Sequence, residues 1–277
     1  MAGPYIHSKT LGQLQSVWSS GAHGVLIAGP KGVGLVDMVM YVSADDAKFA
    51  TWVRPLKDEA TDYEKGSITV SQIRELYDTL KTRSEAGRVV IIDAAEKMAE
   101  PAQNAFLKLL EEPPVGVRFV LLSHSPQFLL PTMRSRVQRV DALPLSRGQS
   151  EALLDELGVD EPMKRTQLLF IAEGLPGELR LLAGDDEAFM RRAEIVRDAR
   201  TFLQGTQYER LKLAHSYKDS KEKALLLIGD ALKQLRQSAA KTGDAGAIMR
   251  MNRLQDAYDS IRQNGNIRLQ LAATLVV

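Results

Sequence analysis

The 277-residue sequence has no cysteine, no long hydrophobic run and no marked excess of either charge. Without cysteine, disulfide bonds, thiolate zinc sites and a cysteine nucleophile are excluded. No apolar run approaches the roughly 20 residues that span a bilayer, and the first ten residues lack an apolar signal core. We therefore expect a cytoplasmic protein without membrane contact. The histidines do not have the spacing of metal ligands, so no metal site is predicted; they are His7, His23, His124 and His215.

The net charge is +1, which argues against a dedicated, stand-alone nucleic-acid-binding protein, because such proteins usually carry a strong basic excess. Apolar residues make up 44% and charged residues 26% of the sequence, as in ordinary soluble globular proteins. At roughly 150 residues per domain, the length predicts about two domains.

Short apolar segments alternate with amphipathic helical patterns in the first half of the chain. The apolar segments lack the period-2 alternation of half-exposed strands, so they predict a parallel sheet covered on both faces. Ser71 is the candidate N-cap of the third helix, and Ser125 with Pro126 is expected to open a short helix through Leu130. The strand candidates are residues 24–29, 49–53, 88–93 and 117–123, and the main helix candidates are residues 10–20, 35–42, 71–80 and 101–112.

The pattern changes in the second half, where from about Gly148 only amphipathic helices are expected. A compact helical segment of some forty residues comes first, and longer helical patterns follow. The predicted domains are an α/β domain at residues 1–145, a small helical domain at 146–185 and an all-helical domain at 186–277.

The sequence "GPKGVGLV" lies between the first strand and its helix, where phosphate-binding loops occur. In the pattern GxxxxGK[ST], backbone N–H groups cradle phosphates, the lysine reaches the terminal phosphates and the hydroxyl binds Mg²⁺. Here Leu35 stands at the lysine position and Val36 at the hydroxyl position. The loop residues of interest are Gly29, Lys31, Gly32, Gly34, Leu35 and Val36. The glycines alone would also serve to pack a helix closely on a strand.

Two later segments carry a resemblance to a known family. "NAFLKLLEEPP" is a helix that ends in LEEPP, and "FVLLSHSPQFLLPTMRSRVQRV" is a strand followed by a loop with the triplet Ser135, Arg136 and Val137. In this order and spacing, residues 24 to 145 resemble the clamp-loader branch of AAA+ proteins, and most closely its bacterial delta-prime group, with valine in place of the family's SRC cysteine. The resemblance implies an AAA+ parallel-sheet domain, a helical lid and a C-terminal helical collar.

The second nucleotide motif of that family is present in outline at "VVIIDAAE". Asp93 follows an apolar strand at the position of a Mg²⁺ ligand. The resemblance implies a water-orienting glutamate at the next position, but the residue there is Ala94. Glu96 remains nearby and is interpreted as a solvated acid at a helix entry.

Arg136 matches the family's arginine finger, which acts on ATP bound by a neighbouring subunit. A guanidinium is permanently charged and planar, and its donors suit phosphate oxygens. Arg134 is the second choice for this role. From the residues alone, Arg134, Arg136 and Arg139 could instead form a basic strand edge or contact DNA phosphates.

The resemblance extends more weakly into the helical regions. "GLPGEL" is similar to the family's lid segment, but Glu178 stands where an ATP-sensing arginine commonly occurs, and Arg180 is interpreted as a surface residue. "NGNIRLQL" is similar to a collar-helix motif, with Ile267 in place of proline. The four-cysteine zinc module of many relatives is absent.

The sequence therefore predicts a delta-prime-like subunit that does not hydrolyse ATP and that supports sliding-clamp loading onto primed DNA. By resemblance its partners are gamma/tau-like and delta-like subunits, and the complex contacts the clamp and the primer-template DNA. It would be part of the DNA-directed DNA polymerase III holoenzyme without ATPase activity of its own. No cofactor is expected, although binding of ATP or ADP without turnover stays open. The alternatives are an active, divergent gamma/tau-like AAA+ ATPase and a stand-alone DNA-binding module.

Overall fold

The computed structural model describes residues 5–43, 50–82, 88–242 and 246–275. The chain forms two compact units, Met1–Leu181 and Leu182–Val277. The predicted domain boundaries near residues 145 and 185 stay predictions. None of the helices in the described ranges is long and apolar enough to cross a membrane.

A five-stranded parallel sheet forms the centre of the first unit, as the apolar segments predicted. Its strand order is β2-β5-β6-β1-β7. The central strands are almost entirely buried, which explains why they lack polar alternation. The strands are β1 (Gly24–Ala28), β2 (Thr51–Val53), β5 (Arg88–Ile92), β6 (Val117–Ser123) and β7 (Gln138–Asp141).

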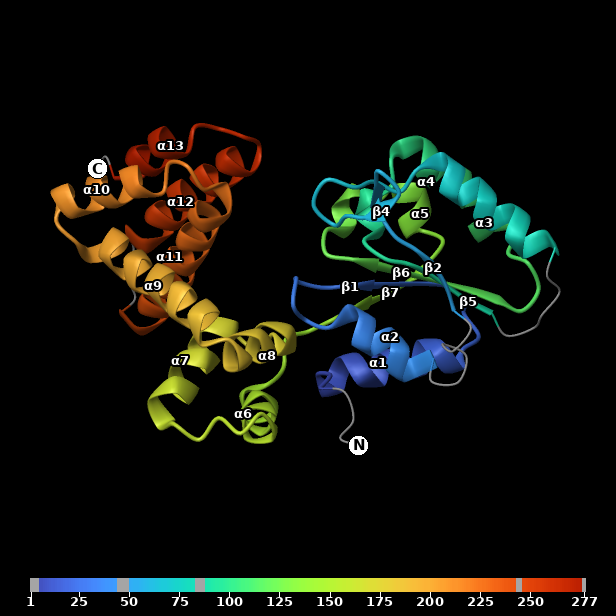
Figure 1. Ribbon diagram of the computed structural model, residues 1–277, viewed down its shortest axis with the longest axis horizontal. Coiled ribbons are helices and arrows are strands. Elements are labelled where there is room, and N and C mark those ends of the chain that lie inside the picture. The colour runs from blue at the N-terminus through green and yellow to red at the C-terminus, as the bar shows by residue number, and fades with distance from the viewer. Residues whose placement is uncertain (1–4, 44–49, 83–87, 243–245, 276–277) are drawn as a thin grey trace. The chain divides into compact units, whose positions relative to one another are not determined.

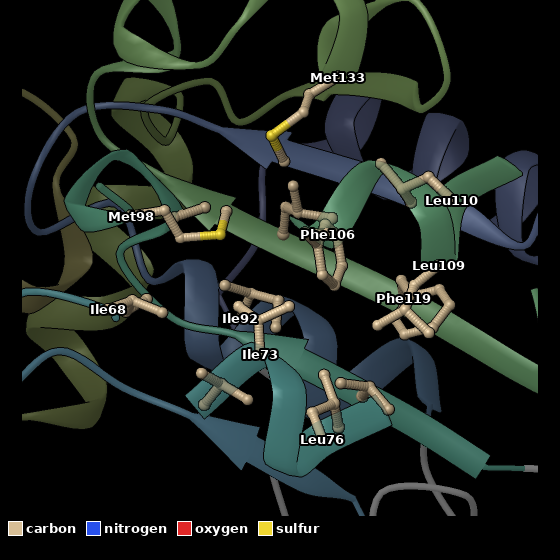
Figure 2. Packing of buried hydrophobic residues seen from close by; sticks show 14 of the residues in the cluster. Ile68, Ile73, Leu76, Ile92, Met98, Phe106, Leu109, Leu110, Phe119 and Met133 are labelled. Atoms are coloured by element: carbon tan, nitrogen blue, oxygen red, sulfur yellow. The ribbon is translucent and has the colours of Figure 1, made fainter. Parts of the chain in front are cut away.

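Helices cover both faces of this sheet (Figure 1). Helices α1 (Ser8–Ser19) and α2 (Leu35–Ser43) lie on one face, and α3 (Val70–Thr82) and α4 (Glu100–Glu111) lie on the other. Strand β1 serves both faces, because Ile27 packs in the cluster with α1 and α2 while Leu26 packs with α3 and α4. Figure 2 shows the cluster between the sheet and helices α3 and α4, in which the rings of Phe106 and Phe119 meet edge to face with centroids 5.2 Å apart.

Two local expectations need correction, and one further element was not predicted. Helix α3 begins at Val70, and Ser71 is not its cap: Thr69 exchanges hydrogen bonds with Gln72, whose side-chain oxygen accepts from the Thr69 N–H at 2.9 Å. A small hairpin of β3 (Leu56–Lys57) and β4 (Ala60–Thr61) was not predicted from the sequence, and Tyr63 lies just after it. The helix expected from Ser125 to Leu130 is a single 3₁₀ turn, Pro126–Phe128, and helix α5 (Pro131–Arg134) follows.

The described residues after β7 form only helices, as predicted. In the first unit these are α6 (Arg147–Glu156), α7 (Pro162–Ala172) and the start of α8 (Pro176–Gly184). The second unit has its own hydrophobic core, which includes Phe202, Leu227 and Ile261. A salt bridge between Arg192 and Asp230, whose side chains are 13% and 5% exposed, joins two of its helices. The helices of this unit are α9 (Asp186–Gln204), α10 (Gln207–Ser216), α11 (Lys221–Thr242), α12 (Gly246–Arg262) and α13 (Ile267–Ala273).

Candidate functional site

The glycine loop joins β1 to α2 and has a backbone that requires glycine. Gly32 and Gly34 have φ angles of +82° and +86°, which L side chains rarely adopt. A Cβ atom at Gly29 would lie 2.8 Å from both the Cβ and the carbonyl oxygen of Ala142. The strand, loop and helix of a phosphate-binding site are therefore present.

The side chains of this loop do not provide the groups that bind phosphate and metal. Leu35, at the lysine position, is only 4% exposed and packs in the core beneath the loop with Val33 and Met38. Val36 is partly exposed but has no oxygen with which to bind a metal ion. Lys31 is exposed.

The lid-like segment "GLPGEL" lies directly against this loop. The Gly177 N–H donates a hydrogen bond to the Gly32 carbonyl oxygen at 2.9 Å. A Cβ atom at Gly177 would be 3.1 Å from that oxygen, so the close approach favours glycine. One carbonyl of the loop is thus bonded to the start of helix α8.

An acidic side chain lies in the first turn of the helix that follows the loop. The favourable end of a helix for negative charge is its N-terminus, where a bound phosphate would also be stabilised. Asp37 has this position, and Arg180 Nη1 lies 3.7 Å from Asp37 Oδ2. Arg180 is partly exposed, as the sequence predicted, but it also forms an ion pair beside the loop. Glu178, at the sensor position, is half-buried.

Asp93 lies at the end of β5, where the motif predicted it, and its side chain is 14% exposed. The Tyr63 hydroxyl donates a hydrogen bond to Asp93 Oδ2 at 2.6 Å, and Arg54 Nε lies 3.8 Å from the same oxygen. Burial, together with the hydrogen bond to Asp93, raises the pKa of Tyr63 to about 12, so the hydroxyl keeps its proton at neutral pH. The carboxylate that would face a metal ion is therefore compensated within the chain.

The residues after Asp93 are also engaged by their surroundings. Ala94 is buried and has a φ of +53°. Glu96 Oε1 accepts a hydrogen bond from the His124 N–H at 3.2 Å, and Glu96 Oε2 is buried without a partner among the described residues. The interpretation of Glu96 as a solvated acid is wrong. His124 Nδ1 lies 2.8 Å from the Gly29 carbonyl oxygen, so His124 connects Glu96 to the glycine loop.

Two of the three arginines after β6 are paired with carboxylates. Arg136 Nη2 lies 2.7 Å from Glu111 Oε1, and Arg136 Nη1 donates to the Thr132 carbonyl oxygen at 2.9 Å. Arg139 pairs with Asp141 at 2.7 Å. Because Glu111 belongs to the LEEPP motif, the structure joins the two segments that carried the resemblance. The Arg136 side chain remains 37% exposed.

Sequence reasoning missed the partners of these motif residues. Tyr63 and Arg54 follow no motif, and nothing in their spacing points to Asp93. Asp37 could have been noticed, because an acid in the first turn of a helix competes for the place of a phosphate. Glu111 was already part of a quoted motif, although its contact with Arg136 was not predicted.

Comparison with known proteins identifies relatives of the sheet domain. Residues 48–146 match the family described as "DNA polymerase III, delta subunit". The chain is 36% identical over 140 residues to DNA polymerase III subunit delta' of Pseudomonas aeruginosa, a match that covers 49% of this chain and 42% of that protein. It is 32% identical over 115 residues to the tau/gamma subunit of Haemophilus influenzae, which covers 40% of this chain and 17% of that protein.

These matches cover less than half of either relative, whereas a structural likeness covers nearly the complete chain. A DNA polymerase III gamma subunit-related protein from Thermotoga maritima superimposes with a TM-score of 0.52 and 21% identity, over 96% of this chain and 97% of that one. At this identity the likeness concerns the fold alone. The chain therefore resembles DNA polymerase III delta' subunits in sequence, and its fold is a parallel-sheet α/β domain followed by a C-terminal helical region, in agreement with the expected resemblance and fold class.

Proposed function

We propose that this chain is a clamp-loader subunit that does not hydrolyse ATP and that supports the loading of a sliding clamp onto primed DNA. It contributes subunit interfaces to the complex, and Arg136 acts on ATP bound by a neighbouring subunit. Its partners are gamma/tau-like and delta-like subunits. The complex, rather than this chain alone, contacts the clamp and the primer-template DNA.

The burial of Leu35 is the observation that carries this proposal. Catalysis of phosphoryl transfer depends on positive charge placed around the transferred group, and the loop lysine supplies part of it. At that position this chain has an apolar side chain that is 4% exposed and packed in the core. The nearby loop lysine, Lys31, is exposed and comes four residues earlier. An apolar residue packed in this way argues for a loop kept for its structure.

The contacts of Asp93 give independent support. A carboxylate binds Mg²⁺ in nucleotide sites because its negative charge is available to the metal. Here Tyr63 and Arg54 already contact the same carboxylate oxygen. Metal binding at Asp93 Oδ2 would have to displace an arginine and a hydroxyl, and Ala94 would still leave the attacking water without a base.

The position of Arg136 supports the role in trans. Its guanidinium is bonded to Glu111 and to the Thr132 carbonyl, which limits the orientations that the side chain can adopt. An arginine finger works by presenting charge in a preset geometry to a neighbour's phosphates. At 37% exposure the side chain is still accessible to such a neighbour.

The collar is proposed as a subunit interface because it exposes large apolar side chains. Ile248, Met249 and Leu269 are 63%, 62% and 65% exposed. Exposed apolar groups of this size are typical of protein contact surfaces when they gather in one region. Ile248 and Met249 are adjacent on α12, so they offer a direct test.

Reconstitution with the other clamp-loader subunits of the same organism tests the proposal. The full chain is expected to co-purify with them and to increase clamp loading onto primed DNA. A chain that ends at residue 185, and the double variant Ile248→Glu, Met249→Glu, should lose affinity for the complex. Lys223→Glu, an exposed change on α11, is the matched control. Full-affinity assembly of the truncated chain would remove the collar assignment, and failure of the full chain to assemble would overturn the proposed function.

A further inference from the structure

A cavity of about 320 Å³ lies at the N-terminal ends of strands β1, β5 and β6, whereas the glycine loop follows the C-terminal end of β1. It is lined by the residues that precede or begin three parallel strands, among them His23, Arg88 and Val117. The glycine loop follows the other end of β1. The cavity is thus separate from the candidate nucleotide site, and neither the loop nor Asp93 takes part in it.

A buried arginine at this cavity has an unsatisfied donor. Arg88 is 8% exposed, and its Nη1 atom has no hydrogen-bond partner among the described residues. Buried polar groups in folded proteins are almost always hydrogen-bonded, and a buried charge without a partner is unfavourable. A methionine or leucine would fill the same space without that cost. The unsatisfied Nη1 donor therefore points to a ligand.

A second arginine belongs to the lining of the cavity. Arg118 also lines the cavity, and its guanidinium lies 4.1 Å from the centroid of the Trp18 ring. That stacking holds a second cation at the cavity wall. None of the described residues that line the cavity is an aspartate or glutamate. The described part of the lining thus contains arginine side chains and no carboxylate, which suits an anionic ligand.

We propose that this cavity binds an oxyanion, a carboxylate or a phosphate group, with Arg88 as its principal ligand. A guanidinium matches both groups, because its parallel N–H donors can bond two oxygens at once. Pro113, Pro114 and the 96%-exposed Val115 form an apolar part of the lining. The anion is thus carried by a molecule with an apolar portion, for which inorganic phosphate and acetate are minimal probes.

Thermal unfolding of the full chain and calorimetric titration test the proposal. Sodium phosphate or sodium acetate is compared with sodium chloride at equal ionic strength. At least one of the two anions is expected to raise Tm in a saturable way, because a ligand that binds only the folded state stabilises it. The anion that raises Tm more shows whether the ligand carries a phosphate group or a carboxylate. No specific effect of either anion would overturn the proposal.

Variants locate the site. Arg88→Met should weaken binding of the effective probe about 10- to 100-fold, the loss expected for a charge-assisted hydrogen bond. Arg118→Met is a second variant that leaves Arg88 in place and should also weaken binding. Arg147→Met, which removes an 82%-exposed arginine side chain elsewhere, is the matched control and should not. A response retained in both cavity variants would assign the anion to another site, such as the glycine loop, and would contradict the proposal.

Discussion

Asp93 illustrates how a motif residue can be retained while its surroundings change. In a nucleotide site its carboxylate would be compensated by Mg²⁺, whereas here Tyr63 and Arg54 contact it. Arg54 is itself held over the Trp52 ring, with 4.4 Å between the guanidinium carbon and the ring centroid. The carboxylate therefore links the end of β5 to Tyr63 and Arg54 within the sheet domain.

The hydrogen bond from Tyr63 predicts a pH dependence of stability. The pKa of Tyr63 is raised from 10.0 to about 12 by burial and by the bond to Asp93, so the folded state retains the proton over a range in which the unfolded state loses it. The contribution of this hydroxyl is therefore complete below pH 10 and is lost as the pH rises toward 12. In urea unfolding, wild type should lose more stability over this range than Tyr63→Phe.

An exposed tyrosine provides the control for that experiment. Tyr208 is 76% exposed, and Tyr208→Phe should follow the wild-type dependence on pH. Parallel curves for wild type and Tyr63→Phe would contradict the role given to the Tyr63 hydroxyl.

Arg136 should matter to the complex more than to its own chain. Its pair with Glu111 joins side chains that are 37% and 49% exposed, and such pairs contribute at most about 1 kcal/mol. Arginine fingers of other nucleotide hydrolases increase turnover about 10³- to 10⁵-fold. A ring with several sites can keep the others active, so a smaller loss is expected. Arg136→Ala should leave Tm and assembly nearly unchanged while it lowers clamp-stimulated ATPase and clamp loading by the complete complex.

Arg134→Ala is the matched control, because it removes an exposed positive charge two residues away. Equal defects in the two variants at matched salt would indicate that both arginines act only through their positive charge, toward DNA or at a subunit interface. Full clamp-stimulated ATPase and clamp loading in the Arg136→Ala complex would contradict the proposed action of Arg136 on a neighbouring subunit's ATP.

Among the secondary-structure elements, the glycine loop with α2 combines the backbone of a phosphate-binding loop with a buried apolar side chain at the lysine position. The φ angles of Gly32 and Gly34 and the close approach at Gly29 preserve the turn. The first residue of α2 nevertheless packs inward. The loop is stabilised from outside by the hydrogen bond of Gly177 to Gly32.

Restoring the lysine should therefore destabilise the fold. Leu35→Lys removes a 4%-exposed apolar side chain and introduces a charge next to Val33 and Met38. The expected loss is about 2 to 5 kcal/mol in the free energy of unfolding, measured in urea. Val36→Thr, at a 39%-exposed position, is the control and should change stability by less than about 0.5 kcal/mol.

The same pair of changes addresses ATP turnover. The double variant Leu35→Lys, Val36→Thr should not recover efficient turnover of ATP, because the side chain at position 35 packs in the core and Ala94 still provides no base. A stable Leu35→Lys variant would mean that the side chain at position 35 can leave the core, contrary to the packing described.

Most strands and helices could be predicted from the sequence because their signals are local. The buried strands are continuous apolar runs, and α4 has Pro101 in its first turn and ends two residues before Pro113. The partners of Asp93 could not be predicted, because Tyr63 and Arg54 reach it only through the fold. Glu96 was misinterpreted for a similar reason. Its carboxylate accepts a hydrogen bond from the N–H of His124, which follows β6 and is 28 residues away in the sequence.

The complete chain combines two units that each have a hydrophobic core. The first has the sheet with its two covering layers, and the second packs its own helices around residues such as Leu227 and Ile261. The proposed function assigns this chain to a larger assembly, and its central claim is that the chain performs no ATP hydrolysis.

Steady-state phosphate release by the purified chain tests that claim most directly. With saturating ATP and Mg²⁺, the account predicts a rate equal to that of a protein-free sample, and the same rate for Asp93→Ala. The two proteins should agree because Leu35, Val36 and Ala94 leave the site without its phosphate, metal and water ligands. Release above background by the wild-type chain that disappears in Asp93→Ala would contradict the account.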